Sequence, residues 1–238
     1  MQVLLSSLAD LLMPRVCVVC GRALLSCEKH LCMECGADMP LTCFEGLVHN
    51  PMADKFNALV EAPQYVRATA LFYYRAGYQD ITRELKYHRN FPLGRWAAAM
   101  LGRRMSLRGW GPFDAVVPVP LHPSRRLSRG YNQAELIASV LSRELGAPLE
   151  TGLLRRVRRT VSQTSLSARE RCDNVAGAFA AVPQRRLGAG FSPPGTVLLV
   201  DDVFTTGATL AACHDALRAV FGDSVRISVA TLAYVGDD

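Results

Sequence analysis

Runs of apolar residues, separated by longer amphipathic stretches, set the pattern of this chain. Residues 114–121, 196–203 and 225–235 are apolar runs of the kind that form buried strands. Residues 65–76 are rich in β-branched and aromatic side chains, which also favours a strand. The pattern therefore predicts four strands.

The stretches between these strands carry the signals of helices. A helix is predicted over residues 78–90, and another over residues 92–105, which begins with a proline and continues with good helix formers. Two further helices follow loops, within residues 124–146 and 205–222, and each ends at a glycine. Strands that alternate with helices predict an α/β fold with a mainly parallel sheet and helices on both faces.

Cysteines mark the N-terminal segment. Cys17 and Cys20 form one C-x-x-C pair, and Cys32 and Cys35 form a second pair eleven residues later. Two such turns can present four thiolates to one zinc ion in a tetrahedral, closed site. The spacing therefore predicts one structural zinc, with disulfides or a redox-active C-x-x-C as the alternatives.

Three further zinc-ligand candidates remain in this segment: Cys27, His30 and Cys43. Either Cys27 or His30 could replace one ligand, although the paired spacing favours the four cysteines named above. Because so small a segment cannot build a core, the metal should supply most of its folding energy. We expect a zinc-ribbon-like module at residues 1–45, a linker at 46–64 and the main domain at 65–238.

Composition narrows the class of protein. The chain has 238 residues, of which half are hydrophobic and a fifth charged, as in a globular protein with one core. No apolar run reaches the roughly eighteen residues of a membrane span. Asp10 interrupts the first apolar stretch and no basic residue precedes it, so we expect no signal peptide and a cytoplasmic protein. The net charge of +6 suits nucleic acid or phosphorylated partners, but a merely basic soluble protein would show the same charge.

The strand at 196–203 carries two adjacent aspartates, Asp201 and Asp202. Neighbouring carboxylates repel each other and are costly to bury without a partner. The Thr/Gly-rich turn at 205–209 then begins a helix, whose backbone N–H groups can hold a phosphate. An ordinary strand-to-helix turn would explain the threonines but not the acids. Since parallel sheets bind ligands at the carboxyl ends of their strands, the pattern predicts a sugar phosphate site.

This stretch, VLLVDDVFTTGAT, resembles the phosphoribosyl pyrophosphate (PRPP) motif of type I phosphoribosyltransferases. Other segments resemble the ComF family of competence-associated proteins, which includes the GntX-like proteins. They follow one another in the order of that family through nearly the whole chain: CVVC…CMEC, ITRELKYHRNFPLGRWAA, VVPVPLHPSRRLSRGYNQAELIA and RRTVSQTSLSARERCDNVAGAF. The resemblance implies a zinc-ribbon-like segment followed by a type I phosphoribosyltransferase-like domain.

The resemblance also implies roles for single residues. Asp201 and Asp202 would be the catalytic acids and would hold the ribose 2′- and 3′-hydroxyls of PRPP, directly or through Mg²⁺. The residues expected at the 5′-phosphate are Thr205, Thr206, Gly207, Ala208 and Thr209. Those expected near the pyrophosphate are Arg125, Arg126, Arg129 and Gly130. The candidates on a loop that closes over the substrate are Arg158, Arg159, Gln163, Arg169 and Arg171.

Several of these residue types have simpler explanations. The basic residues at 155–159 could form a solvated helix end or a patch that contacts DNA. Asn132 and Gln133 could cap the helix that follows them. We expect Lys86 and His88 at the surface rather than in catalysis.

Two functions remain open. In the first, the protein is an enzyme that uses Mg²⁺ and transfers phosphoribose from PRPP to an acceptor that nothing in residues 65–112 identifies. In the second, it is a non-catalytic PRPP-binding accessory protein for DNA uptake or processing. Such a protein would contact single-stranded DNA or a DNA-processing partner protein.

Overall fold

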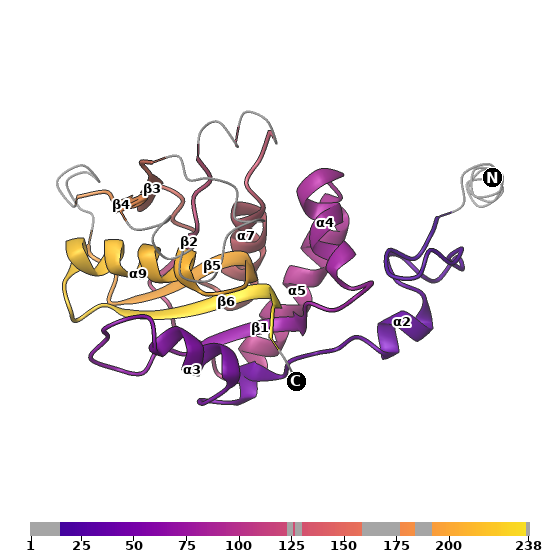
Figure 1. Ribbon diagram of the computed structural model, residues 1–238, viewed down its shortest axis with the longest axis horizontal. Coiled ribbons are helices and arrows are strands. Elements are labelled where there is room, and N and C mark those ends of the chain that lie inside the picture. The colour runs from indigo at the N-terminus through magenta and orange to yellow at the C-terminus, as the bar shows by residue number, and fades with distance from the viewer. Residues whose placement is uncertain (1–14, 123–125, 127–129, 159–176, 184–191, 237–238) are drawn as a thin grey trace.

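A computed structural model describes residues 15–122, 126, 130–158, 177–183 and 192–236 of the chain. Within them, four strands form a sheet whose neighbours are all parallel, in the order β1-β6-β5-β2 (Figure 1). The strands are β1 (Ala68–Tyr73), β2 (Ala115–Pro118), β5 (Thr196–Phe204) and β6 (Arg226–Tyr234). Each lies inside one of the four predicted runs or extends it by one residue.

Helices cover one face of this sheet. They are α4 (Gln79–Tyr87), α5 (Phe91–Leu107) and α7 (Gln133–Leu145). Ile81, Leu101 and Ile137, one from each helix, belong to a buried cluster with Leu198 and Val200 of β5. This face of the sheet is therefore sealed by three of the predicted helices.

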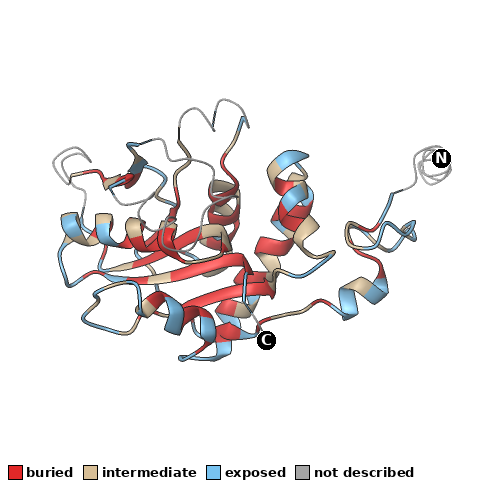
Figure 2. Ribbon diagram, in the orientation of Figure 1, coloured by how far each residue is buried: buried red, intermediate tan, exposed pale blue. Residues whose placement is uncertain are grey.

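The opposite face packs against α3 (Pro51–Asn57), α9 (Ala208–Phe221) and a ribbon of the antiparallel strands β3 (Leu154–Arg156) and β4 (Phe179–Ala181). The intervening residues Val197 and Leu199 of β5 point into this second cluster. Both faces of β5 are buried, which explains why its sequence is a continuous apolar run. Figure 2 shows the buried residues concentrated along the sheet. The predicted fold class, a mainly parallel sheet with helices on both faces, is confirmed.

Local capping sets the bounds of α7. The side chain of Asn132 accepts a hydrogen bond from the backbone N–H of Ala134 at 3.1 Å, and its amide donates to the carbonyl of Val119 at 3.0 Å. The helix ends at Gly146, whose φ of 64° is left-handed. The capping role considered for Asn132 is therefore confirmed.

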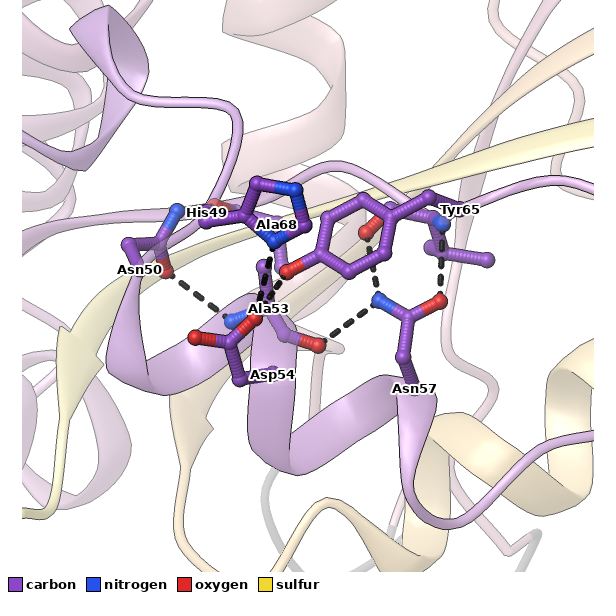
Figure 3. Close-up of polar contacts among 8 residues, drawn as sticks. His49, Asn50, Ala53, Asp54, Asn57, Tyr65 and Ala68 are labelled. Atoms are coloured by element: carbon purple, nitrogen blue, oxygen red, sulfur yellow. Dashed lines mark hydrogen bonds and ion pairs between the residues drawn. The ribbon is translucent and has the colours of Figure 1, made fainter.

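Residues 46–64, which we expected to be a linker, are instead part of the packed fold. Met52 and Phe56 of α3 are fully buried against the sheet. Asn50 caps α3 at Ala53 and also donates to the carbonyl of Ala68 (Figure 3). The linker prediction is wrong because α3 has only seven residues, too few for a helical repeat of apolar positions to be recognised in the sequence.

Further polar contacts fasten α3 to the approach to β1. Asn57 bonds both the N–H and the carbonyl of Val66, each at 2.9 Å. Asp54 accepts a hydrogen bond from the hydroxyl of Tyr65 and pairs with His49, whose Nδ1 lies 3.3 Å from its Oδ1 (Figure 3). These bonds explain how so short a helix keeps its place.

The cysteine-rich module stands at one end of the molecule, on the side of α4 (Figure 1). It contains the short helix α2 (Met33–Ala37), and a 3₁₀ turn, η1 (Phe44–Gly46), follows it. The hydroxyl of Tyr78, at the start of α4, donates to the carbonyl of Cys35 at 2.9 Å, and the ring of His30 lies 5.7 Å from that of Trp96 in α5. The module therefore packs on the helices of the main domain. No helix among the described residues is long and apolar enough to cross a membrane.

Candidate functional site

The four cysteines of the doubled C-x-x-C motif come together. The sulfur atoms of Cys17, Cys20, Cys32 and Cys35 all lie within 4.8 Å of one another, and those of Cys20 and Cys32 are 3.8 Å apart. Zn–S bonds of about 2.3 Å at tetrahedral angles separate two sulfurs by about 3.8 Å. The four thiols therefore fit a zinc ion, and four thiolates would leave no open position on the metal for a substrate.

The surroundings shift the pKa of two of these thiols in opposite directions. Burial, together with hydrogen bonds to the other cysteines, raises the pKa of Cys35. Burial raises the pKa of Cys17, but hydrogen bonds from backbone N–H groups, that of Cys32 first, outweigh it and lower the pKa to about 7. Cys27 is exposed and lies outside the cluster, while His30 packs beside Trp96. Neither replaces one of the four cysteines.

The two acids lie in β5, just before its last residues, and open into a cavity of about 290 Å³ at the carboxyl ends of the strands. The turn that begins α9 forms another wall of this cavity. Asn132, Gln133 and Arg156 complete the polar lining, together with Lys86 from α4. The structure thus brings both predicted acids and most of the turn at 205–209, predicted to bind phosphate, into one cavity.

Lys86 is part of this site, and our expectation of a surface role for it was wrong. Its Nζ lies 2.9 Å from Oδ2 of Asp202, and the two side chains are only 24% and 13% exposed. Burial alone would lower the pKa of Lys86, but the charge of Asp202 and the bond to it raise the pKa overall. The sequence did not reveal this role, because a lysine in an amphipathic helix is equally compatible with solvent. His88, by contrast, lies at the surface and pairs with Glu84.

Asp201 has a different environment from its neighbour. Burial and the adjacent charge of Asp202 raise its pKa to about 7. The backbone N–H of Asp202, which donates to Oδ1 of Asp201 at 2.9 Å, and the positive charges of Lys86 and Arg156 only partly oppose this shift. One member of the pair is thus a fixed ion-pair partner, and the other gains or loses a proton near neutral pH.

The turn between β5 and α9 requires a glycine at its centre. Gly207 has a φ of 82°, and a Cβ there would lie 2.7 Å from Phe204 and 2.9 Å from Leu59. Thr205, Gly207, Ala208 and Thr209 line the cavity. The hydroxyl of Thr206 instead accepts the N–H of Ala208 at 3.4 Å, so Thr206 serves the helix start. The N-terminus of this fourteen-residue helix therefore faces the cavity.

The other predicted site residues are only partly described. Gly130 does not line the cavity; its φ is 79°, and a Cβ there would lie 2.8 Å from the guanidinium of Arg89. Arg126 is exposed and lies 3.4 Å from Glu135. Arg158 is exposed at the end of the β3–β4 ribbon. The remaining predicted ligands lie outside the described residues: Arg125, Arg129, Arg159, Gln163, Arg169 and Arg171.

Arg156 of β3 is a further lining residue that the sequence analysis did not single out. Its guanidinium lies 5.1 Å from the ring centre of Phe179 in the paired strand β4. The ribbon therefore places this arginine in the same cavity as the acids. In sequence, Arg156 lies just before the segment that we expected to close over the substrate. Strand alternation beside the buried Leu154 could have identified it.

A larger cavity, of about 530 Å³, lies at the opposite, amino ends of the strands. Both of its carboxylates are already engaged: Asp114 accepts the N–H groups of Gly195 and Thr196 at 2.9 and 2.8 Å, and Asp223 pairs with Arg218. Parallel sheets bind ligands at the carboxyl ends of their strands. The smaller cavity with the acids is therefore the candidate functional site.

Several known proteins are similar to this chain, although no family model matches it. Competence protein F of Haemophilus influenzae is 39% identical over 115 residues, so the chain spans about half (48%) of that relative's length. DNA utilization protein YhgH of Escherichia coli K12 is 32% identical over 204 residues, which cover 82% of this chain and 81% of that protein. Competence protein ComFC of Streptococcus pneumoniae is 30% identical over 141 residues, covering 59% of this chain and 57% of that protein.

A solved structure is also similar. It is the adenine phosphoribosyl transferase from Trypanosoma brucei in complex with AMP, pyrophosphate and ribose-5-phosphate, with 14% identity and a TM-score of 0.36 over 79% of this chain and 82% of that one. The relatives found by sequence have much higher identity to this chain, between 30% and 39%. An identity of 32% across 82% of this chain and 81% of the Escherichia coli protein shows that the protein belongs to the ComF family.

Proposed function

We propose that this protein binds PRPP, or a similar ribose phosphate, in the cavity at the carboxyl ends of the strands, and that it acts in competence or DNA use. The observation that carries the proposal is the meeting of the carboxylates of Asp201 and Asp202 with the N-terminus of α9 in one cavity of about 290 Å³. Carboxylates suit the hydroxyls of a sugar, and a helix N-terminus suits its phosphate. The names of the relatives support the biological process.

The acids, the turn and Arg156 each have a role in this proposal. Asp201 and Asp202 accept hydrogen bonds from the two ribose hydroxyls. The backbone N–H of Gly207, at the start of α9, and the hydroxyl of Thr209 bind the 5′-phosphate. Arg156 faces the negative charge of the pyrophosphate, as a guanidinium matches phosphate oxygens. Mg²⁺, when bound, would help to neutralise the pyrophosphate.

Transfer of the phosphoribosyl group would rest on positioning and electrostatics. Positive charge grows on the ribose as the anomeric C–O bond breaks, and the acids beside the ring stabilise it. Pyrophosphate leaves with the bonding electrons, and its negative charge develops toward Arg156. An acceptor then forms the new bond to the anomeric carbon.

A non-catalytic role is the second candidate. The net charge of +6 and the relatives named for DNA utilization favour a PRPP-binding accessory protein that contacts single-stranded DNA or a DNA-processing partner protein. Pyrophosphate release with candidate acceptors would support the enzyme. Binding of single-stranded DNA that weakens steeply with salt, without pyrophosphate release, would support the accessory role.

The binding proposal is tested by thermal stability with PRPP and Mg²⁺. A ligand at a hundred times its Kd should stabilise the fold by about 2.7 kcal/mol. Gly207→Ala should abolish this response, while Gly152→Ala, whose Cβ would meet no atom within 4 Å, should retain it. Thr209→Val gives a second test if the Gly207 variant does not fold. Absence of any shift at millimolar PRPP with folded wild-type protein would overturn the proposal.

A further inference from the structure

The acid pair already has a cation of its own. Lys86 reaches the cavity from α4, and its ammonium lies 2.9 Å from Oδ2 of Asp202. Ile81 and Leu85 of the same helix are fully buried, so α4 holds the lysine stem in place. The ion pair is also shielded, with the lysine 24% and the aspartate 13% exposed. It is therefore a fixed feature of the site.

This arrangement does not fit a divalent metal on the same carboxylates. A magnesium ion would lie about 2.0–2.1 Å from a carboxylate oxygen and needs near-octahedral ligands. On Asp202 it would compete with the ammonium for the same carboxylate and be repelled by its charge. Arg156 adds a second positive charge to the lining of the same cavity. The acids thus already have cationic side chains beside them, whereas a metal-dependent site would keep carboxylate oxygens available to bind the ion.

We propose that Lys86 takes the place of a metal ion at the acid pair, so that the carboxylates bind the diol of a ribose phosphate without a divalent cation. The part about the ribose phosphate rests on the proposed function. The ammonium offsets the repulsion between the two acids and fixes the orientation of Asp202, leaving its remaining acceptor positions for a hydroxyl. A divalent ion is then needed only by ligands that carry a pyrophosphate of their own. Lys86 is a positioning residue that acts through Asp202.

The first experiment measures metal binding without any sugar. Mn²⁺ replaces Mg²⁺ as a probe because its free form is counted directly by electron paramagnetic resonance, and it binds too weakly to thiolates to displace zinc. Wild-type, zinc-loaded protein should show no Mn²⁺ site at the acids. Lys86→Met should gain one site, at least about tenfold tighter than any in wild type, because a like charge has been removed. Adding Asp202→Asn to that variant should remove the new site, and Lys29→Met, at an exposed lysine, should resemble wild type.

The second experiment measures the affinity for ribose 5-phosphate, which carries no pyrophosphate. Wild type should bind it equally well with and without Mg²⁺. Lys86→Met should bind it at least about tenfold more weakly without metal and recover affinity when Mg²⁺ is added. A merely structural lysine would not produce this metal dependence. Lys86→Gln replaces the methionine variant if that variant does not fold.

The outcomes separate the two proposals. A wild-type protein that binds Mn²⁺ at the acids as tightly as Lys86→Met would overturn the assignment of Lys86. So would ribose 5-phosphate binding that needs Mg²⁺ in wild type. If wild type binds no ribose 5-phosphate under either condition, but Lys86→Met alone gains the Mn²⁺ site, the assignment of Lys86 stands and the proposed function fails.

Discussion

Two adjacent carboxylates of the same residue type differ in what surrounds them. Oδ2 of Asp202 lies 2.9 Å from Nζ of Lys86, whereas the half-buried Asp201 has the like charge of Asp202 beside it. Asp202→Asn should therefore destabilise the ligand-free protein by about 1 kcal/mol or more, because the ammonium loses its counterion. Asp201→Asn should leave it equally or more stable, since an amide oxygen can still accept the N–H of residue 202. Denaturant unfolding of both variants measures the difference, and equal losses would contradict it.

The raised pKa of Asp201 predicts a pH dependence of stability. The folded protein holds a proton on this carboxyl up to a pKa of about 7, whereas an unfolded aspartate releases it near about 3.9. The folded state binds more protons in this interval, so the contribution of Asp201 is fully present below about pH 4 and is lost as the pH rises through 7. Wild type minus Asp201→Asn isolates the effect of the acid pair, because zinc and the distant acids contribute equally to both. A difference in unfolding free energy that stays flat between pH 5 and 7, the window that this shift implies, would refute the assignment.

At the scale of elements, α3 is a structural part of the domain. Phe56 is fully buried between the sheet and α9, near Phe204 and His214. Phe56→Ala should cost about 3–5 kcal/mol in unfolding free energy, through lost burial and the cavity left behind. Leu107→Ala, at an 85% exposed leucine, should change it by less than about 0.5 kcal/mol. A Phe56 variant as stable as the control would contradict this structural role and would support the linker prediction for residues 46–64.

At the scale of the whole molecule, the metal module and the main domain share a core. Cys17, Leu31 and Cys32 belong to the same buried cluster as α4 and α5. We expect one zinc per chain by elemental analysis. Cys32→Ser should lose it and lower the melting temperature of the entire chain in one transition, because the support of α4 at Tyr78 is lost as well. Cys27→Ser, outside the cluster, should keep both metal and stability. An unchanged main transition in the zinc-free variant would show that the module is independent.

Local signals were sufficient for much of this molecule. Buried strands such as β5 need apolar residues on both faces, so the run itself reveals them. The doubled C-x-x-C fixes the four thiols by spacing, since each knuckle is only a few residues long. The two acids and the glycine-centred turn also lie within one short stretch of chain. These features follow from the sequence alone because each is formed by neighbouring residues.

Tertiary structure alone decided the character of the site. Lys86 of α4 reaches Asp202, and Arg156 of β3 lines the same cavity, only because the helices and the ribbon pack around the end of one sheet. In the sequence, a lysine in an amphipathic helix is equally compatible with solvent. The position of α3 depends likewise on the backbone carbonyls of Val66 and Ala68, which its side chains reach across nine and eighteen residues of chain. Long-range packing therefore determines which of the two carboxylates forms an ion pair, because the lysine that pairs with Asp202 comes from a distant segment of the chain.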